Sequence, residues 1–157
     1  MTPPAAPSVD VLALGNAIVD VLSHVDDAVI DSLPVNKGVM TLIGAVEAQN
    51  MYAALGPGVE CSGGSAANTV VGAAMLGART AFVGRVKDDQ LGSIFAHDIR
   101  AAGVRFDTAA ATDGPDTAVC LVMVTPDAHR TMCTHLGASI QLGPDDVDES
   151  PVRGSAV

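Results

Sequence analysis

Short apolar runs rich in β-branched residues alternate along this sequence with longer stretches of helical periodicity. The clearest strand-like runs are 9–14 and 80–86, and the clearest helical stretch, 88–102, places apolar side chains three or four residues apart. Strands that alternate with helices favour a mostly parallel sheet that is covered by helices. We therefore predict an α/β fold.

Three further strand-like pieces stand outside this alternation, at 17–25, 38–42 and 118–136. The last of them contains a turn-rich connection, 125–130, which predicts a hairpin. We expect the three pieces to form a second, smaller sheet. Residues 1–8 are predicted to be a loose tail, so that the folded unit runs from 9 to 157.

The charge balance excludes some classes of partner. The chain has 18 acidic and 8 basic residues, which give a net charge of −10. A negative field repels phosphate backbones and anionic membranes, and with only 3% aromatic residues the chain has few side chains on which bases could stack. We therefore expect no nucleic-acid partner and no membrane partner. The longest uncharged run, 61–78, is not predicted to span a membrane, because polar residues interrupt it.

The cysteines Cys61, Cys120 and Cys133 are odd in number and lack C-x-x-C spacing. They predict reduced thiols in a cytoplasmic protein, and the N-terminal residues lack the features of a signal peptide. The four histidines have no mutual spacing typical of metal ligands, so we predict no metal site. We interpret Asp88-Asp89 as a helix cap and the acidic run 145–149 as a solvated helix start.

A glycine pair, Gly63-Gly64, stands where a predicted strand turns into a predicted helix, and Asn68 follows about one helical turn later. Glycines let the backbone approach a ligand closely. The free N–H groups of a helix start and the amide of Asn68 suit hydroxyl or anionic oxygens. The pattern favours a polyhydroxyl ligand, while the alternative interpretation is a tight turn under a neighbouring strand.

Asn16 and Asp20 form a second pair of candidate residues. The period of two in an extended strand places them on one face, beside apolar neighbours. A carboxylate in such a place is costly unless it accepts hydrogen bonds, which a vicinal diol would donate. In the alternative interpretation, Asp20 is solvated or bonds a nearby backbone amide.

Four short segments combine glycine with polar residues: Gly15-Asn16-Ala17-Ile18-Val19-Asp20, Ser62-Gly63-Gly64-Ser65-Ala66-Ala67-Asn68, Val83-Gly84-Arg85-Val86-Lys87-Asp88-Asp89-Gln90-Leu91-Gly92 and Leu136-Gly137-Ala138-Ser139. In order and spacing they resemble the N-terminal half of the ribokinase-like (PfkB) carbohydrate and nucleoside kinases, over roughly 10–149. The first and last segments most resemble adenosine kinases. Val70 and Lys87 stand where the family more often has a small residue and a glycine.

The resemblance implies a Rossmann-type, mostly parallel sheet with helices on both faces and a small β-sheet lid, without the C-terminal half of the family's fold. It implies that the sugar or ribose is held by Asn16, Asp20, Gly63, Gly64 and Asn68. Cys120 would line a nucleoside pocket, although as a small apolar residue it could equally be plain core. Arg130 would contact the transferred phosphate, or be an exposed turn residue.

The same resemblance implies a reaction in which the γ-phosphate of ATP passes to the 5′-hydroxyl of a nucleoside, with Mg²⁺ required. The family's catalytic Asp lies in a D-x-x-G-A-G-D motif, which this sequence does not contain. We therefore expect the ATP site to be absent from this chain and the chain alone to be inactive. The alternatives are a fructokinase-type or ribokinase-type sugar kinase, and a non-catalytic sugar-binding module that forms a homodimer through the lid sheet.

Overall fold

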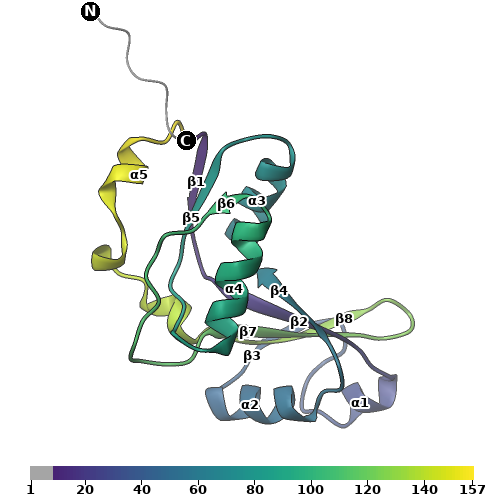
Figure 1. The fold of residues 1–157 in the computed structure, drawn as a ribbon. Helices are drawn as coiled ribbons and strands as arrows, with labels where there is room; N and C mark the ends of the chain where they lie inside the picture. The colour runs from purple at the N-terminus through teal and green to yellow at the C-terminus, as the bar shows by residue number, and fades with distance from the viewer. Residues whose placement is uncertain (1–8) are drawn as a thin grey trace, which may run out of the picture.

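The computed structural model describes residues 9–157, so the tail predicted for 1–8 lies outside the described residues (Figure 1). Three strands form a small, entirely parallel sheet in the order β1-β5-β6. They are β1 (Val11–Leu14), β5 (Thr80–Val83) and β6 (Val104–Arg105). The strands β1 and β5 are shorter than the predicted runs 9–14 and 80–86, because the ladder between them pairs only Val11–Leu14 with Thr80–Val83.

Helices α3 (Ser65–Met75) and α4 (Gln90–Ala101) lie on one side of this sheet, and the short α5 (Glu149–Arg153) lies on the other (Figure 1). The core beneath α4 holds every phenylalanine of the chain. Phe82, Phe95 and Phe106 are at most 1% exposed, and their ring centroids lie 5.4–6.1 Å apart. This aromatic cluster joins α4 to the parallel sheet.

The second sheet has five strands in the order β3-β8-β7-β2-β4. Its pairs β2–β4 and β7–β8 are antiparallel, whereas β2–β7 and β3–β8 are parallel. The second sheet predicted from the sequence is therefore present, but it is the larger of the two, because β4, the strand predicted before Gly63-Gly64, also pairs into it. Its strands are β2 (Ile18–His24), β3 (Met40–Leu42), β4 (Val59–Gly63), β7 (Ala118–Val124) and β8 (Arg130–His135).

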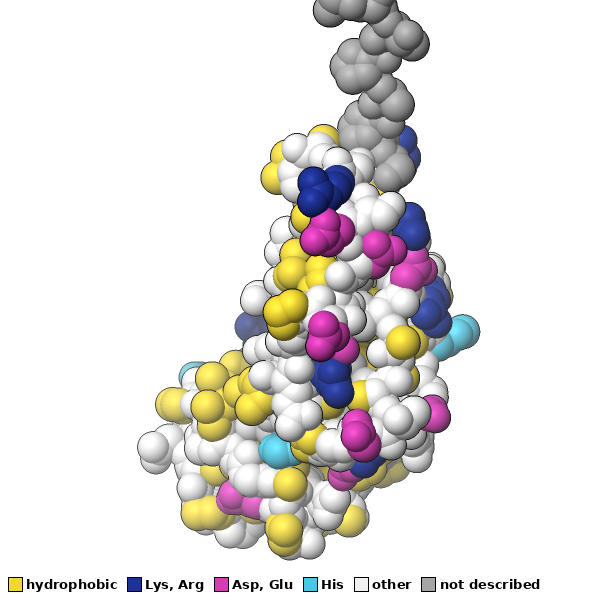
Figure 2. Space-filling model, turned by 90° about the vertical axis from the view of Figure 1, so that its left-hand side faces the viewer, with side chains coloured by type: hydrophobic (Ala, Val, Ile, Leu, Met, Phe, Trp, Pro, Cys, Tyr) yellow, Lys and Arg dark blue, Asp and Glu magenta, His cyan; other side chains and the backbone are white. Residues whose placement is uncertain are grey.

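The two faces of the five-stranded sheet differ in their surroundings. One face carries Val19, Leu121 and Cys133, which are buried in the core together with residues of α1 (Asp27–Asp31) and α2 (Ala45–Ala54). The opposite face, which we call the open face, carries large apolar side chains that stay 37–67% exposed. They are Leu22, Met40, Leu42 and Val59. Figure 2 shows hydrophobic side chains gathered on the left of the lower half of the molecule, at the level of this sheet.

Two short 3₁₀ helices, η1 (Gly137–Gln141) and η2 (Pro144–Asp146), connect β8 to α5. The predicted cap of α4 is confirmed, because the Asp89 side chain accepts a hydrogen bond from the Gly92 N–H at 2.8 Å. The interpretation of 145–149 as fully solvated is wrong at Asp146. That side chain is only 18% exposed and forms an ion pair with Arg85 at 2.7 Å.

Candidate functional site

Asp20 lies on the open face of β2, the strand beside the edge strand β4, in a row of paired residues that crosses all five strands. The strand register places Cys61 on one side of Asp20 and Cys120 on the other, and continues to Thr134 and Leu42. Residues paired across neighbouring strands point to the same face. The row therefore runs from the Asp20 carboxylate to the apolar side chain of Leu42 on β3, three strand spacings or about 14 Å away.

Gly63 lies against the Asp20 carboxylate. A Cβ at residue 63 would overlap the carboxylate carbon and both of its oxygens. Gly63 is the last residue of β4, next to the start of α3, and it is buried. The absence of a side chain at this position is therefore what leaves room for the Asp20 carboxylate between two strands.

The Asp20 carboxylate is half-buried, yet within residues 9–157 no group donates a hydrogen bond to it. Burial raises the pKa of Asp20, because desolvation disfavours the charged form and no cation or donor offsets it. A carboxylate in this condition gains most from a ligand that brings O–H donors.

A second close approach, between the backbones of Gly64 and Asn16, lies near Asp20. Gly64 adopts φ +96°, and a Cβ there would lie 2.7 Å from the carbonyl oxygen of Asn16. Gly64 is also the residue that precedes the first turn of α3, and its carbonyl accepts a hydrogen bond from the Asn68 N–H at 2.9 Å. The structure thus brings the start of α3 against the connection between β1 and β2.

The placement of Asn16 corrects one step of the sequence argument. Because β2 begins at Ile18, Asn16 lies in the 15–17 connection, and strand alternation does not determine where its side chain points. Asn16 and Asn68 are both exposed, and within residues 9–157 neither side chain has a hydrogen-bond partner. Both amides are therefore accessible beside the Gly63–Gly64 turn.

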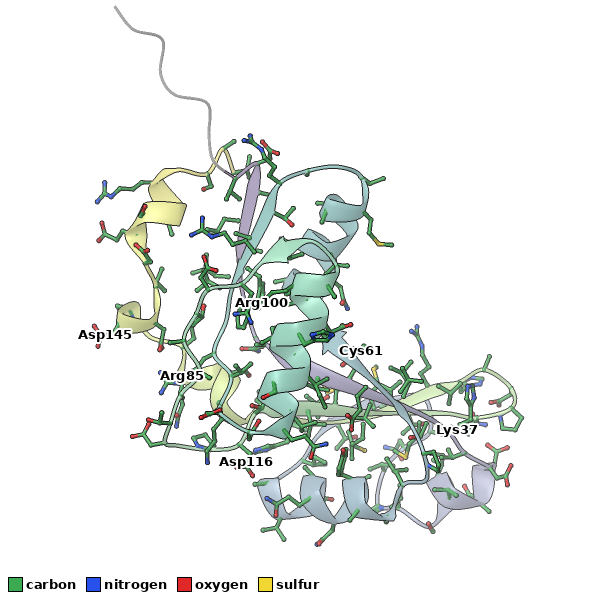
Figure 3. The ribbon with its side chains drawn as sticks, in the orientation of Figure 1. Lys37, Cys61, Arg85, Arg100, Asp116 and Asp145 are labelled. Carbon is green, nitrogen blue, oxygen red and sulfur yellow. The ribbon has the colours of Figure 1, made fainter. Side chains whose placement is uncertain are left out.

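The two cysteines beside Asp20 are free thiols. Burial raises the pKa of both Cys61 and Cys120, so neither is activated as a nucleophile. Cys120 is 7% exposed and lies 3.3 Å from the Thr134 hydroxyl that donates to it. Cys61 lies on β4 beside α4 (Figure 3).

Arg130 is exposed at the start of β8, and within the described residues its side chain forms no hydrogen bond or ion pair. It pairs with Val124, four residues along β7 from Cys120. The strand rise puts it about 13 Å from the Asp20 row, on the same face. The structure therefore does not bring Arg130 into contact with Asp20.

A groove of about 310 Å³ opens at the apolar end of the Asp20 row. Leu42 and Thr134, which belong to the row, line it together with Ile43, Leu136 and Ile140. Ile140 is 66% exposed. Sequence reasoning did not identify this groove, because it forms between β3 and the β8–η1 segment, which lie far apart in the chain.

In the part of the chain that is described, no group of three or more His, Cys, Asp or Glu side chains is placed to hold a metal ion. In the same residues no helix is both long and apolar enough to cross a lipid bilayer.

Solved structures with similar folds identify the class. The chain matches an adenosine kinase from Sinorhizobium meliloti with 50% identity and a TM-score of 0.85, over 94% of this chain and 45% of that one. It matches a probable sugar kinase from Rhizobium etli with 45% identity and a TM-score of 0.86, over 95% of this chain and 45% of that one. The two sheets and their arrangement define an α/β protein of the ribokinase-like fold.

The family follows from the sequence match. The model of the pfkB family carbohydrate kinases matches residues 34–153, and the chain belongs to this family. A probable fructokinase from Arabidopsis thaliana is 30% identical over 134 residues, which are 80% of this chain and 40% of that relative. The chain thus spans less than half the length of the relatives and solved structures that it matches.

Proposed function

We propose that this chain supplies the acceptor-binding part of a nucleoside kinase of the pfkB family. In this proposal Asp20 accepts hydrogen bonds from the two ribose hydroxyls of the nucleoside. The observation that carries the proposal is the half-buried Asp20 carboxylate, which lies against Gly63 and has no hydrogen-bond donor within residues 9–157. A vicinal diol offers two O–H donors to one carboxylate, and hydrogen bonds to a charged acceptor are among the strongest.

Other residues of the site have supporting roles. Gly63 and Gly64 leave the backbone beside the Asp20 carboxylate without side chains, so that the ribose can approach it closely. The exposed amides of Asn16 and Asn68 donate to and accept from the remaining sugar oxygens. Arg130 neutralises charge on the phosphoryl oxygens when the hairpin approaches them. ATP supplies the phosphoryl group and Mg²⁺ its counter-charge, as the family membership implies.

The open face favours a nucleoside over a free sugar. From Asp20 to Thr134 the row spans two strand spacings, about 10 Å, and it ends in the apolar groove beside Leu42. When the ribose is bound at Asp20, the base of the nucleoside extends along this row toward its apolar end at Leu42. A free hexose would use only the Asp20 end and leave the groove without a function.

Calorimetric titration of the chain with adenosine, inosine, ribose and fructose tests the proposal. We expect the nucleosides to bind at least tenfold more tightly than either sugar, and Asp20→Asn to weaken nucleoside binding at least tenfold. Asp113→Asn is the matched control, because Asp113 is an exposed carboxylate in the 112–114 loop. Tighter binding of fructose or ribose would support the sugar-kinase alternative instead, and absence of binding by all four would overturn the proposal.

An assay of phosphoryl transfer distinguishes the kinase proposal from the alternative of a non-catalytic binding module. A chain that spans the full length of its relatives, and carries these residues, should transfer phosphate from ATP to a nucleoside 5′-hydroxyl. In that chain we expect Asp20→Ala to lower kcat/KM at least about 100-fold, from lost diol binding and positioning. Binding of nucleosides without any turnover in that longer chain would favour the binding-module alternative.

A further inference from the structure

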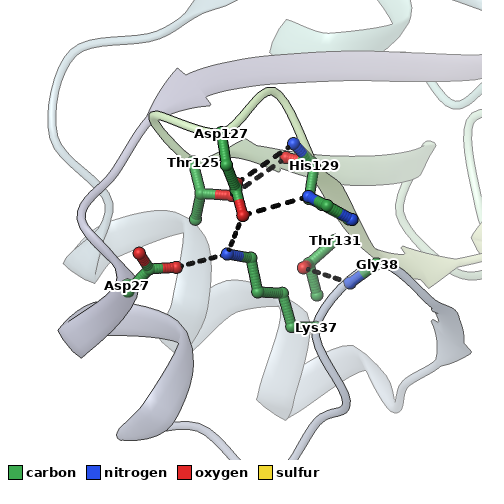
Figure 4. Close-up of polar contacts among 7 residues, drawn as sticks. All are labelled: Asp27, Lys37, Gly38, Thr125, Asp127, His129 and Thr131. Atoms are coloured by element: carbon green, nitrogen blue, oxygen red, sulfur yellow. Dashed lines mark hydrogen bonds and ion pairs between the residues drawn. The ribbon is translucent and has the colours of Figure 1, made fainter.

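A single lysine joins three segments at the tip of the five-stranded sheet. The Lys37 Nζ atom lies 2.6 Å from Asp27 Oδ1, at the start of α1, and 2.6 Å from Asp127 Oδ2, in the turn between β7 and β8 (Figure 4). Lys37 and Asp127 are 90 residues apart in sequence. The only other lysine of the sequence is Lys87.

Asp127 also shapes the turn of the hairpin. Its Oδ1 atom accepts hydrogen bonds from the Thr125 hydroxyl at 2.6 Å and from the His129 N–H at 3.3 Å. Its Oδ2 atom lies 3.1 Å from His129 Nδ1. The turn places Ala128 at φ +64°, a conformation that a non-glycine residue adopts only when its surroundings hold it there. These contacts hold the pKa of Asp127 far below its ordinary value, and the hydrogen bond from Lys37 has the largest effect.

A second contact fixes the segment beside Lys37 to the same hairpin. The Gly38 N–H donates to the Thr131 hydroxyl at 2.9 Å, and the Met132 N–H donates to the Val39 carbonyl at 3.1 Å. Thr131 is fully buried. Lys37 is therefore flanked by a segment that is hydrogen-bonded to β8, and its side chain reaches the β7–β8 turn, where Arg130 follows His129.

We propose that Lys37 is a positioning residue that fixes the β7–β8 hairpin, and with it Arg130, over the open face. This inference rests on the proposed function, in which Arg130 meets the phosphate. Arg130 is adjacent to the turn that Asp127 organises, and its own side chain has no partner within residues 9–157. Its position is therefore set by the hairpin alone.

Electrostatics make Lys37 specific for this role. Because Asp27 and Asp127 each place an oxygen 2.6 Å from the same nitrogen, those oxygens are within about 5 Å of each other, where like charges repel. Without the ammonium group, this repulsion pushes the turn away from α1. Exposed ion pairs contribute little to global stability, so the effect is expected in the placement of the hairpin rather than in the overall stability of the fold.

Hydrogen exchange in the chain measures hairpin placement without any ligand. We expect Lys37→Met to raise exchange of the Thr125, Ala128 and His129 amides, which are hydrogen-bonded within the turn, at least threefold. The rescue variant is Lys37→Arg, which keeps the positive charge between the two carboxylates and should restore slow exchange. Lys87→Met is the matched control, because Lys87 bonds Gly114 and Asp116 away from the hairpin.

Ligand titration then tests the connection to Arg130. We expect Lys37→Met to weaken binding of AMP at least threefold, in parallel with Arg130→Met, while binding of adenosine stays unchanged. A merely structural lysine would affect both ligands alike. Unchanged exchange in Lys37→Met, or equal weakening of AMP and adenosine, would overturn the inference. If the unsubstituted chain binds no adenosine, the proposed function fails, and the exchange experiment alone still decides whether Lys37 fixes the hairpin.

Discussion

The ionised Asp20 carboxylate, on which the proposed site rests, destabilises the fold through its burial. Burial raises its pKa, so the folded state binds the proton more tightly than the unfolded state. The ionised form therefore carries a cost that is fully present above the folded-state pKa. This cost falls as the pH decreases through that pKa, and it vanishes below the ordinary carboxyl range near about 4. Residues that serve binding at the expense of stability are typical of functional sites.

Asp20→Asn should therefore separate stability from binding. We expect the variant to unfold at the same temperature as the unsubstituted chain or above it at pH 7, with a difference that shrinks as the pH is lowered toward 4. Thermal unfolding followed by circular dichroism at several pH values measures this, with Asp113→Asn as the exposed control. A variant that melts lower at pH 7 would mean that the ionised carboxylate stabilises the fold through a contact that we have not identified.

Two glycines of the same helix region should respond in opposite directions to alanine. Gly64→Ala forces φ +96° on an L-residue and places Cβ 2.7 Å from the Asn16 oxygen, which should cost about 1–3 kcal/mol. Gly72 lies inside α3 with open space around it, so Gly72→Ala should stabilise by about 0.5–1 kcal/mol. Urea unfolding compares them, and equal effects of the two substitutions would contradict this account of Gly64.

At the scale of elements, one carboxylate connects α4 to the five-stranded sheet. Asp89 caps α4 through the Gly92 N–H, and it also accepts hydrogen bonds from the Thr117 N–H at 2.9 Å and the Thr117 hydroxyl at 2.7 Å. Thr117 directly precedes β7. Gly92 has no space for a side chain, because its Cβ would overlap the Lys87 carbonyl. The D-D-x-x-G segment is thus the joint between α4 and the five-stranded sheet.

Removing this joint should be costly. Asp89→Ala loses the cap and both bonds to Thr117, so we expect it to destabilise the chain by about 2–3 kcal/mol. Asp88→Ala is the neighbouring control, since Asp88 is exposed, and its effect should stay within about 0.5 kcal/mol. Chemical denaturation of both variants measures the difference, and comparable losses would show that Asp89 is not the joint.

Local patterns were sufficient to predict some elements. The β7–β8 hairpin and α4 follow from turn residues and apolar periodicity, and the structure confirms both. The inclusion of β4 in the five-stranded sheet was not predictable, because only long-range pairing with β2 defines it. The placement of Asn16 outside β2 was also missed, since the period of two says nothing about where a strand begins.

Some parts of the candidate site could likewise be predicted from the sequence, and others could not. Motif and chemistry indicated Asp20 and the glycine pair, and the contact between Gly63 and Asp20 was visible only in the folded chain. The groove at Leu42 and the Lys37 contact with Asp127 depend on segments brought together by the strand register. Single-sequence reasoning has no signal for such pairs.

At the scale of the whole molecule, the unequal faces of the five-stranded sheet predict association. The open face exposes Met40 at one edge strand and Val59 at the other, at 51% and 67%, and large exposed apolar patches favour pairing of copies. The outer edge of β1 is covered by residues 155–157, because the Leu12 N–H donates a backbone hydrogen bond to the Val157 carbonyl oxygen. The open face is thus the stronger candidate for contact between copies.

Sedimentation of the chain tests this prediction. We expect a mass above that of the monomer at about 100 μM, and a shift toward monomer in the double substitution Met40→Lys and Val59→Lys, since charges on a sheet surface oppose association. Met75→Lys is the control, because Met75 is 80% exposed on α3, away from this sheet. A monomer in every sample would contradict the prediction.

One titration decides whether Asp20 binds the ribose diol of a nucleoside. Calorimetry of the chain with adenosine and with 2′,3′-dideoxyadenosine compares ligands that differ only in the two hydroxyls. We predict that loss of the diol weakens binding at least tenfold, about 1.4 kcal/mol, and that Asp20→Asn removes most of this difference. Equal affinity for the two ligands, or a difference that persists in Asp20→Asn, would contradict the claim.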